Sequence, residues 1–357
     1  MKMIDSRLRV ATLLTCVVCI VGWDFEESVS GQELPKAAWT TVRPKASVSY
    51  RGLCVTPDGS QWVSGSLGTV MKSHGGNSWK EVSPLNFEKL DFRSIHAWDD
   101  QNACIASAGQ PAIILRTEDG GLHWREVFRH DDPQAFFDAL HFSDANHGLC
   151  ISDPLNGIWL LVESNDQGRS WKVMDTKESP RASEGEAAFA ASNGSWVFTG
   201  RGQGALATGG DVDGGMARIH VRDADGKWSR WTAPIRSNKS SGIFAIAFGP
   251  HLGWIAVGGD YMRADDGRSS AVWSRDGILW NEAKIQPSGY RSSLAMVESS
   301  LGPLVLAIGP SGGDGSRDGS SWARWSDEGF HVIRWDASAR RVWAAGSDGR
   351  IAFTAVP

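Results

Sequence analysis

Three arginines follow aromatic residues at widely separated positions of the chain. They occur in the pairs Tyr50-Arg51, Phe92-Arg93 and Tyr290-Arg291. A guanidinium group keeps its charge near neutral pH, and its planar N–H donors match a carboxylate through two parallel hydrogen bonds. If folding brings the three side chains together, they form an anion-binding cluster. The sequence leaves a second interpretation open, in which each arginine pairs with an Asp or Glu of a neighbouring element.

Other polar and aromatic residues stand at places that the repeat described below predicts to lie on the same face. With the three arginines they make up the candidate ligand-binding set: Arg51, Arg93, Arg291, Tyr290, Asp138, Glu186, Arg201, Asp260 and Tyr261. Further residues at similar predicted places are Asp153, Glu184, Ser311, Asp314 and His331. The nine histidines are dispersed without an HExxH pattern, and the three cysteines after residue 31 show no CxxC spacing. We therefore expect no metal site and no cofactor, and we assign no catalytic residue.

A short turn motif of the form S/T-x-D-x-G-x-x-W recurs along the chain and identifies the elements that must position these residues. Its members, in two complete and three degenerate copies, are Thr117, Asp119, Gly121 and Trp124; Ser164, Asp166, Gly168 and Trp171; Asp223 and Trp228; Asp276 and Trp280; Asp318 and Trp322. Asp and Ser/Thr side chains can bond the backbone of their own turn, and Gly accepts a positive φ. A Trp buries a large apolar area. We expect the motif to be structural, neither catalytic nor metal-binding.

The tryptophans of these motifs set the period of the fold. Together with Trp79 they are separated by 45, 47, 57, 52 and 42 residues, and the four-stranded blades of propellers repeat at about 40–50 residues. Short β-prone runs broken by Gly-containing turns fill each period. The innermost strands are predicted to begin near Tyr50, Asp91, Phe136, Gly185, Gly242, Gly289 and Gly329. The sequence thus predicts an all-β fold, a seven-bladed β-propeller of four-stranded blades.

The last predicted blade has only three strands up to Pro357. A segment around Trp39 precedes the first blade, and Trp39 lies 40 residues before Trp79, which is one blade period. We expect this N-terminal strand to complete the last blade and close the ring, because closure removes an exposed sheet edge. Residues 32–357 are expected to form a single propeller domain and a monomer.

The first 31 residues have the pattern of an export signal. Basic residues precede an apolar run from about Val10 to Trp23, too short for a bilayer core of about 30 Å, and small residues follow near position 31. An uncleaved anchor is the alternative, because acidic residues stand between the run and the cleavage site. We expect an exported protein, periplasmic or extracellular, without a membrane span in the mature chain. A formal net charge of -5 argues against a nucleic-acid partner.

The motif and several phrases of the sequence resemble a known family. The motif looks like the Asp-box of BNR repeats, and the phrases are FRSIHAWDD, GEAAFAAS, SGIFAIAF, GWIAVGGDY, GYRSSLAMV and GPSGGDGS. They are similar to the photosystem II stability/assembly-factor family of seven-bladed propellers, and especially to its non-photosynthetic bacterial relatives, over roughly residues 37–357. The resemblance implies a chaperone-like binding platform. It also implies that Arg51, Arg93 and Arg291 are the positions that match the family's arginine patch.

Three classes of function are therefore compared with the structure. The first is a binding or assembly platform that recognises a protein, a glycan or another anionic ligand at the arginine-bearing face. The second is a glycoside hydrolase, which needs either the three arginines, Asp acid and Tyr–Glu pair of a sialidase or two carboxyl groups about 5–10 Å apart. The third is an oxidoreductase, for which the sequence contains no cofactor motif. A deep cleft with paired carboxylates or a Tyr–Glu contact would favour the hydrolase.

Overall fold

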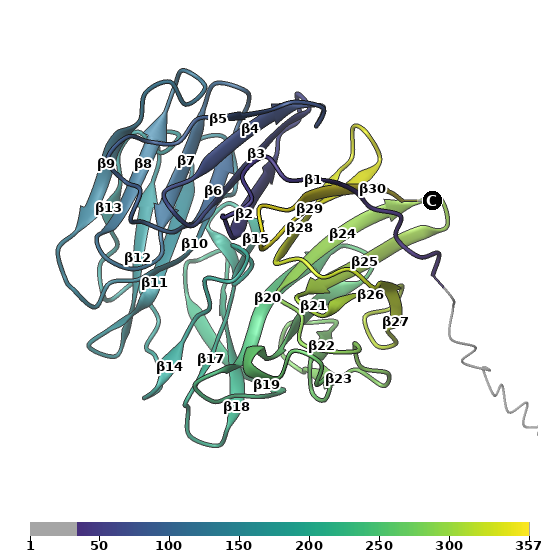
Figure 1. The fold of residues 1–357 in the computed structure, drawn as a ribbon. Helices are drawn as coiled ribbons and strands as arrows, with labels where there is room; N and C mark the ends of the chain where they lie inside the picture. The colour runs from purple at the N-terminus through teal and green to yellow at the C-terminus, as the bar shows by residue number, and fades with distance from the viewer. Residues whose placement is uncertain (1–33, 357) are drawn as a thin grey trace, which may run out of the picture. The chain divides into compact units, whose positions relative to one another are not determined.

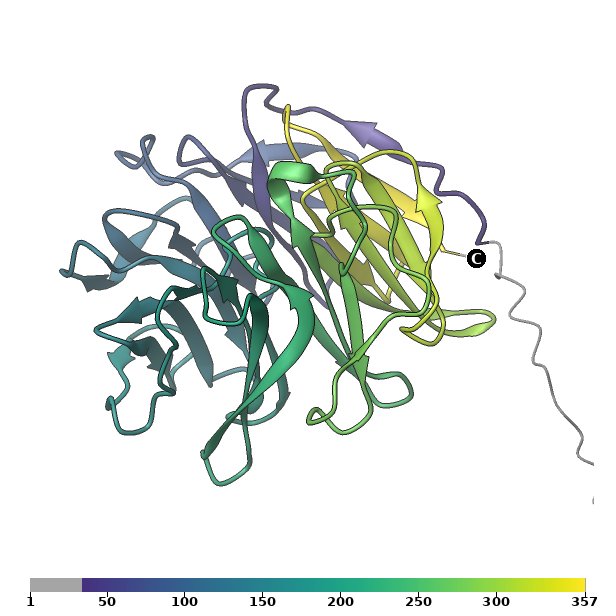
Figure 2. The same ribbon diagram turned by 90° about the horizontal axis from the view of Figure 1, so that it is seen from below.

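The computed structural model describes residues 34–356. The expected export signal over residues 1–31 lies outside the described residues. Seven antiparallel sheets follow one another around a ring, and the colour passes around it from purple to yellow until the last sheet lies beside the first (Figures 1 and 2). The only helical element of residues 34–356 is the short 3-10 helix η1 (Tyr261–Arg263), and no helix among them is long and apolar enough to cross a membrane. The prediction of an all-β, seven-bladed propeller is confirmed.

The first three blades have four strands each, hydrogen-bonded in chain order from the axis outward. Blade one consists of β2 (Tyr50–Val55), β3 (Ser60–Gly65), β4 (Val70–His74) and β5 (Trp79–Glu81). Blade two consists of β6 (Phe92–Ala97), β7 (Ala103–Ser107), β8 (Ala112–Thr117) and β9 (Arg125–His130). Blade three consists of β10 (Phe137–Phe142), β11 (Gly148–Leu155), β12 (Ile158–Ser164) and β13 (Lys172–Val173).

Blades four to six continue the ring, and two extra short strands extend the sheet of blade five. Blade four consists of β15 (Trp196–Gly200), β16 (Gln203–Ala207), β18 (Met216–Arg222) and β19 (Trp228–Arg236). Blade five consists of β20 (Ser241–Gly249), β21 (Gly253–Asp260), β22 (Ala271–Ser274) and β23 (Asn281–Glu282), with β14 (Glu186–Ala187) and β17 (Gly209–Gly210) added beside β20. Blade six consists of β24 (Ser293–Ser299), β25 (Gly302–Gly309), β26 (Gly312–Ser316) and β27 (Ala323–Ser326).

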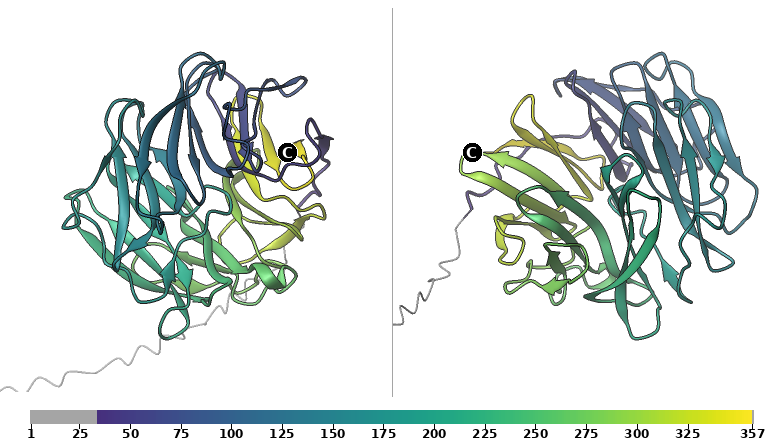
Figure 3. Two further views of the ribbon diagram at one scale, coloured as in Figure 1. Left: turned by 60° about the vertical axis from the view of Figure 1, so that its left-hand side comes forward. Right: turned by 180° about the vertical axis from the view of Figure 1, so that it is seen from behind.

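The N-terminal strand closes the ring as predicted. Blade seven consists of β28 (Val332–Asp336), β29 (Arg341–Ala345) and β30 (Ile351–Ala355), and β1 (Thr40–Val42) pairs antiparallel with β30 as its outermost strand. Trp39, next to β1, donates from Nε1 to Ser326 Oγ at 2.8 Å, so the segment before β1 binds blade six as well. Figure 3 shows the purple N-terminal segment lying against the yellow blade.

The core lies between the blades rather than within one layer. Seven apolar clusters each draw on two neighbouring blades, including the pair formed by blades seven and one. Inner strands are therefore covered on both faces: β3 and β8 are buried at every position, whereas the outer strand β13 is exposed. Strands that are buried on both faces read as continuous apolar runs, which explains why simple alternation is weak in this sequence.

The turns between third and fourth strands have the geometry that the Ser/Thr-x-Asp motif predicts. In the first complete copy, Thr117 Oγ1 donates to Asp119 Oδ1 at 3.0 Å and accepts from the Gly121 N–H at 2.9 Å. The same pattern recurs at Ser164, Ser274 and Ser316. At Asp223 no Ser or Thr takes part, and the carboxylate accepts from two backbone N–H groups of the turn. The motif glycines have φ near +80°, and Trp171, Trp280 and Trp322 are buried between blades.

Blade four differs from its prediction in where it begins. Its innermost strand starts at Trp196, not near Gly185. Residues 189–195, which we call the axial segment, instead cross the centre of the ring and bond the inner strands of the other blades. Ser192 Oγ donates to the Ser292 carbonyl at 2.5 Å, Arg334 Nη2 donates to the Ser192 carbonyl at 2.9 Å, and the Ile246 N–H donates to the Gly194 carbonyl at 3.0 Å. The segment contains Gly, Ala and Ser, which are small enough to pass between converging strands.

Candidate functional site

A repeated β-bulge at the start of the innermost strands leaves one unpaired residue at the ring axis. Pairing skips one residue between Tyr50 and Gly52, between Phe92 and Ser94, between Phe137 and Ala139, and between Ile243 and Ala245. The skipped residues are Arg51, Arg93, Asp138 and Phe244. Because a bulge re-aims the extra side chain, equivalent positions of four blades supply two cations, one carboxyl group and one aromatic ring to the same region.

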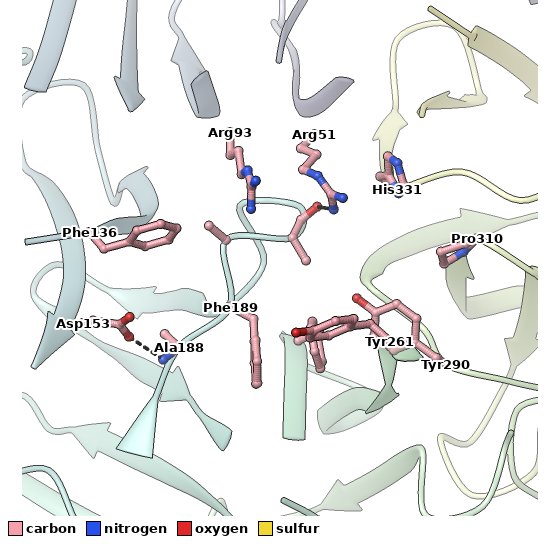
Figure 4. A pocket seen from close by; sticks show the side chains of 13 residues that line it. Arg51, Arg93, Phe136, Asp153, Ala188, Phe189, Tyr261, Tyr290, Pro310 and His331 are labelled. Carbon is pink, nitrogen blue, oxygen red and sulfur yellow. Dashed lines mark hydrogen bonds between the residues drawn. The ribbon is translucent and has the colours of Figure 1, made fainter. Parts of the chain in front are cut away.

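Three of these residues, Arg51, Arg93 and Phe244, line a pocket of about 420 Å³ at the axis. Its lining comprises Arg51, Arg93, Phe136, Asp153, Ala188, Phe189, Ala190, Ala191, Phe244, Tyr261, Tyr290, Pro310 and His331. Figure 4 shows the two arginine side chains next to each other on one side and the aromatic rings facing them from the other. The axial segment forms part of the wall through residues 189–191. A central pocket with a few convergent polar groups on a largely apolar lining is the usual form of a ligand site.

The cationic wall consists of Arg51 and Arg93. Arg93 Nε donates to Asp91 Oδ2 at 2.7 Å, which orients its guanidinium group. Arg51 forms no ion pair with any carboxylate of residues 34–356, and its only hydrogen bond is a long one of 3.5 Å to the Ala191 carbonyl oxygen. Burial and the neighbouring Arg93 charge lower the pKa of Arg51 from its usual value. Asp91 thus partly neutralises Arg93, whereas Arg51 presents its positive charge to an incoming anion without a carboxylate partner.

The aromatic wall is a packed set of rings. Phe189 and Phe244 stack at 3.9 Å between ring centroids, and Tyr290 meets Phe244 edge-on at 4.7 Å. Tyr261, on η1, completes the set at the rim with 48% of its surface exposed. Burial raises the pKa of the Tyr290 hydroxyl above its usual range, so this phenol stays neutral. Such a wall can bind an apolar or aromatic group beside the arginines.

Two carboxyl groups lie on the side of the pocket next to Arg93. Asp153 is half-buried, and its Oδ1 accepts a hydrogen bond from the Ala188 N–H at 2.9 Å (Figure 4). Burial raises the pKa of Asp153 to about 6. Asp138 lies behind it with no exposed surface, and burial together with the Asp153 charge raises its pKa well above the usual value.

His331 carries no positive charge at neutral pH. Its burial and the nearby charges of Arg51, Arg350 and Arg93 lower its pKa to about 3. The positive charge of the pocket therefore comes from the two arginines. His331 can act only as a neutral hydrogen-bonding group beside them.

Solved structures share this architecture with the chain. It matches "YCF48 bound to D1 peptide" with a TM-score of 0.59 at 14% identity, covering 91% of this chain and 100% of that one. It matches YCF48 from Cyanidioschyzon merolae with a TM-score of 0.58 at 15% identity, covering 89% and 99%. The chain is similar in fold to YCF48. The Neurospora crassa Pan2 WD40 domain gives a TM-score of 0.59 at 10% identity, covering 90% and 98%. No protein-family model matches the chain, and no curated protein matches its sequence.

The structure brings Arg51, Arg93, Tyr261 and Tyr290 together, but it places Arg291 elsewhere. Arg291 is fully buried and pairs with Asp314 at 2.6 Å, with additional hydrogen bonds to Ser288 and Ser311. The expectation that three arginines converge is thus corrected to two. For Arg291 the structure favours the alternative interpretation, an ion pair within the fold.

The reason is a shift in register at the start of blade six. The Arg291 N–H donates to Gly258 of the preceding blade, just as the Tyr50 N–H donates to Gly346. Arg291 therefore occupies the position of Tyr50, and Ser292 that of Arg51. The pairing of β24 with β25 begins only at Ser293, so the Tyr-Arg pair of this blade lies before the paired residues and is displaced by one residue relative to that of blade one.

Four other candidates lie outside the pocket lining. Glu186 is buried and bonds His220 Nε2 at 2.6 Å and Thr208 Oγ1 at 2.7 Å. Arg201 lies in the turn between β15 and β16, on the opposite face, because blade four begins later than predicted; it lies 3.7 Å from Asp144. Asp260 caps η1 and lines a separate cavity of about 130 Å³. Asp138, as described above, lies behind Asp153.

The apolar part of the site was not predicted from the sequence. Phe136, Phe189 and Phe244 line the pocket, and none was among the candidates. Phe244 stands in the phrase SGIFAIAF at the bulge position, so aligning the blades on the bulge rather than on the arginines would have found it. Phe189 had no such signal, because the axial segment repeats nowhere else. Within residues 34–356, no group of three or more His, Cys, Asp or Glu residues is arranged to hold a metal ion.

Proposed function

We propose that the protein is an exported binding platform that takes an anionic segment of a partner protein into the axial pocket. The observation that carries the proposal is the combination of Arg51 and Arg93 with the ring cluster of Phe189, Phe244 and Tyr290 in one pocket. A carboxylate can bind both guanidinium groups, and an adjacent apolar side chain can lie against the rings. Such a site fits a peptide with an acidic group beside an apolar residue.

Two further observations support this choice. One structure of similar fold, "YCF48 bound to D1 peptide", holds a peptide, and edge-free propellers provide rigid frames for such ligands. The hydrogen-bonded Ser/Thr-x-Asp turns support assignment to the BNR (Asp-box) propellers. We further propose a bacterial, non-photosynthetic role analogous to that of the assembly factors, with export directed by residues 1–31.

The geometry does not assemble the groups of a sialidase. Arg291 is bound to Asp314 and Glu186 to His220 and Thr208, so neither the third arginine nor the glutamate reaches the pocket. The two carboxyl groups present, Asp138 and Asp153, do not form an acid–nucleophile pair across a cleft, because Asp138 has no exposed surface. No observation favours the hydrolase over the binding platform.

Capture of a partner from an envelope extract, followed by affinity measurement with peptides from that partner, tests the proposal. The double variant R51Q/R93Q should weaken binding at least about tenfold without lowering stability. R43Q, which removes an exposed arginine outside the pocket, is the matched control. Unchanged affinity in the double variant would contradict the proposed site. A defined glycan ligand without a protein partner would instead favour carbohydrate recognition.

A further inference from the structure

The carboxyl group of Asp138 is unusual because it is fully buried and only weakly bonded. Neither carboxylate oxygen forms a hydrogen bond of normal geometry among the described residues, although the nearby backbone N–H groups of Ala190 and Asp153 act on it and oppose the rise of its pKa. An ionised carboxylate in such a place is costly, so the protonated form is favoured. The bulge that aims Arg51 and Arg93 at the axis aims Asp138 in the same way. Asp138 therefore occupies the position that faces the pocket in blades one and two, but its own side chain is buried behind the pocket lining.

Asp153 connects this buried group to the pocket. It lines the pocket, and its Oδ1 accepts the Ala188 N–H, which leaves Oδ2 without a hydrogen-bond partner among residues 34–356. Ala188 immediately precedes the axial segment. Asp153 thus forms part of the pocket wall, and its charge raises the pKa of the buried Asp138.

The surrounding charges make this carboxyl pair responsive to an anion. The charge of Arg93, on β6, lowers the pKa of Asp138. Arg51 of β2 and His331 line the same pocket, and Cys150 of β11 lies on the buried side of Asp138. Burial raises the pKa of the Cys150 thiol, so it is neutral. Glu186 of the adjacent β14 is already bound to His220. Arg93 also bonds Asp91. An anion at the arginines would lie beside Asp153 and repel its charge.

We propose that Asp153 and Asp138 form a proton-binding subsite of the axial pocket, so that an anionic ligand is bound together with a proton. The inference rests on the proposed function and adds its regulation. Below about pH 6 the charges of Arg51 and of the Asp91-bonded Arg93 are opposed by little negative charge from Asp153, because burial raises the pKa of Asp153 to about 6. Above that pH the Asp153 carboxylate opposes the anion. Binding should therefore tighten as the pH falls through 6, and binding should in turn raise the pKa of Asp153, as linkage requires.

N-acetyl-phenylalanine is a suitable probe, because its carboxylate suits the arginines and its ring suits the aromatic wall. Its own carboxyl group has a pKa of about 3.5 and stays ionised at the pH values used. Calorimetry on the full chain, repeated in buffers of different ionisation enthalpy, measures both affinity and proton uptake. We expect binding about tenfold tighter near pH 5 than near pH 8, with net proton uptake near pH 7. D153N should bind with little pH dependence and without proton uptake. D265N, which removes an exposed carboxylate on the same face, should behave like the wild type.

A ligand-free measurement separates this inference from the proposed function. Carbon NMR of labelled aspartate, with Asp153 assigned through D153N, should show a midpoint near 6. A midpoint near the usual value of about 4, or wild-type pH dependence in D153N, would overturn the inference even if the probe binds. If neither N-acetyl-phenylalanine nor its neutral amide binds at any pH, while Asp153 titrates near 6, the proposed anion site itself fails. The proposed link between anion binding and proton uptake then fails as well, although the raised pKa of Asp153 is confirmed.

Discussion

Asn193 and Leu140 bond each other twice across the centre of the ring. The Leu140 N–H donates to Asn193 Oδ1 at 2.7 Å, and Asn193 Nδ2 donates to the Leu140 carbonyl oxygen at 3.0 Å. Asn193 belongs to the axial segment and Leu140 to the innermost strand of blade three. Asn193 has φ of 58° in the left-handed region, which Asn tolerates better than most residues. The Asn193 side chain therefore fixes the axial segment, which forms part of the pocket wall.

The substitution Asn193→Ala should destabilise the protein by about 2–4 kcal/mol. It removes the bonds to Leu140, leaves buried backbone groups without partners, and places a Cβ-bearing residue with no local hydrogen bond in the left-handed region. Chemical denaturation measures the change. Asn193→Gly loses the same bonds but not the backbone preference, so it should cost about 1 kcal/mol less. Equal stability of Asn193→Ala and wild type would show that the axial segment is not anchored through this residue.

The substitution Arg291→Ala should lower the free energy of unfolding by about 3–5 kcal/mol, because it leaves the Asp314 carboxylate buried without its partner. Denaturation with urea provides the measurement, and R43A should change stability by less than about 0.5 kcal/mol. A double variant, R291M/D314L, should recover part of the loss because no charge is left unpaired. If R291A keeps full stability but loses ligand binding, Arg291 belongs to the binding site after all.

The difference in stability between Asp138→Asn and wild type should depend on pH. Burial raises the pKa of Asp138 in the folded state, so wild-type stability from this group is present below the unfolded pKa of about 3.9 and is lost as pH rises through the folded value. Asn cannot ionise, and the variant should therefore be more stable than wild type near pH 8, with the gain disappearing near pH 3.5. Unfolding curves of both proteins across this range measure it. A difference that does not vary with pH would show that Asp138 titrates normally.

The substitution Tyr261→Ala should affect binding rather than stability. Tyr261 is half-exposed on η1 at the pocket rim, so its removal should change the free energy of unfolding by no more than about 0.5 kcal/mol. A ligand that covers the rim should bind about tenfold more weakly, since a lost aromatic contact is worth about 1–2 kcal/mol. Met262→Ala is the neighbouring control, because Met262 is not part of the pocket lining. Equal effects of both substitutions would indicate a general loop effect.

The substitution Trp39→Ala should weaken the ring closure. The Trp39 ring lies 5.3 Å from that of Trp325 and 5.0 Å from that of Phe330, measured between ring centroids. Its Nε1 donates a hydrogen bond to Ser326. Its loss should cost about 2 kcal/mol, less than for a fully buried Trp. Hydrogen exchange should rise first in β1 and in its partner strand β30, because Trp39 fastens the residue before β1 to blade six. Exchange that rises uniformly over all blades would argue against a local role for the closure.

The sequence alone determined the repeating parts of this protein. Turn chemistry is local: Asp119 and Thr117 close their turn with groups a few residues away, and each such turn was recognisable wherever it occurred. The spacing of the tryptophans then set the blade count, and Trp39 revealed the closing strand. These features depend on neighbours in the chain, so they can be identified without knowing the rest of the fold.

The tertiary structure alone decided which residues meet in the pocket. Tyr50-Arg51 and Tyr290-Arg291 look alike, yet the second pair is displaced by one residue relative to the first, so that Arg51 lies in the pocket and Arg291 in the core. A register that differs by one residue changes which side chain faces the axis, and register depends on the partner strand. The axial segment occurs only in blade four, so its path could not be predicted from the repeat. Its position follows from bonds that Asn193 and Ser192 make to strands far away in the sequence.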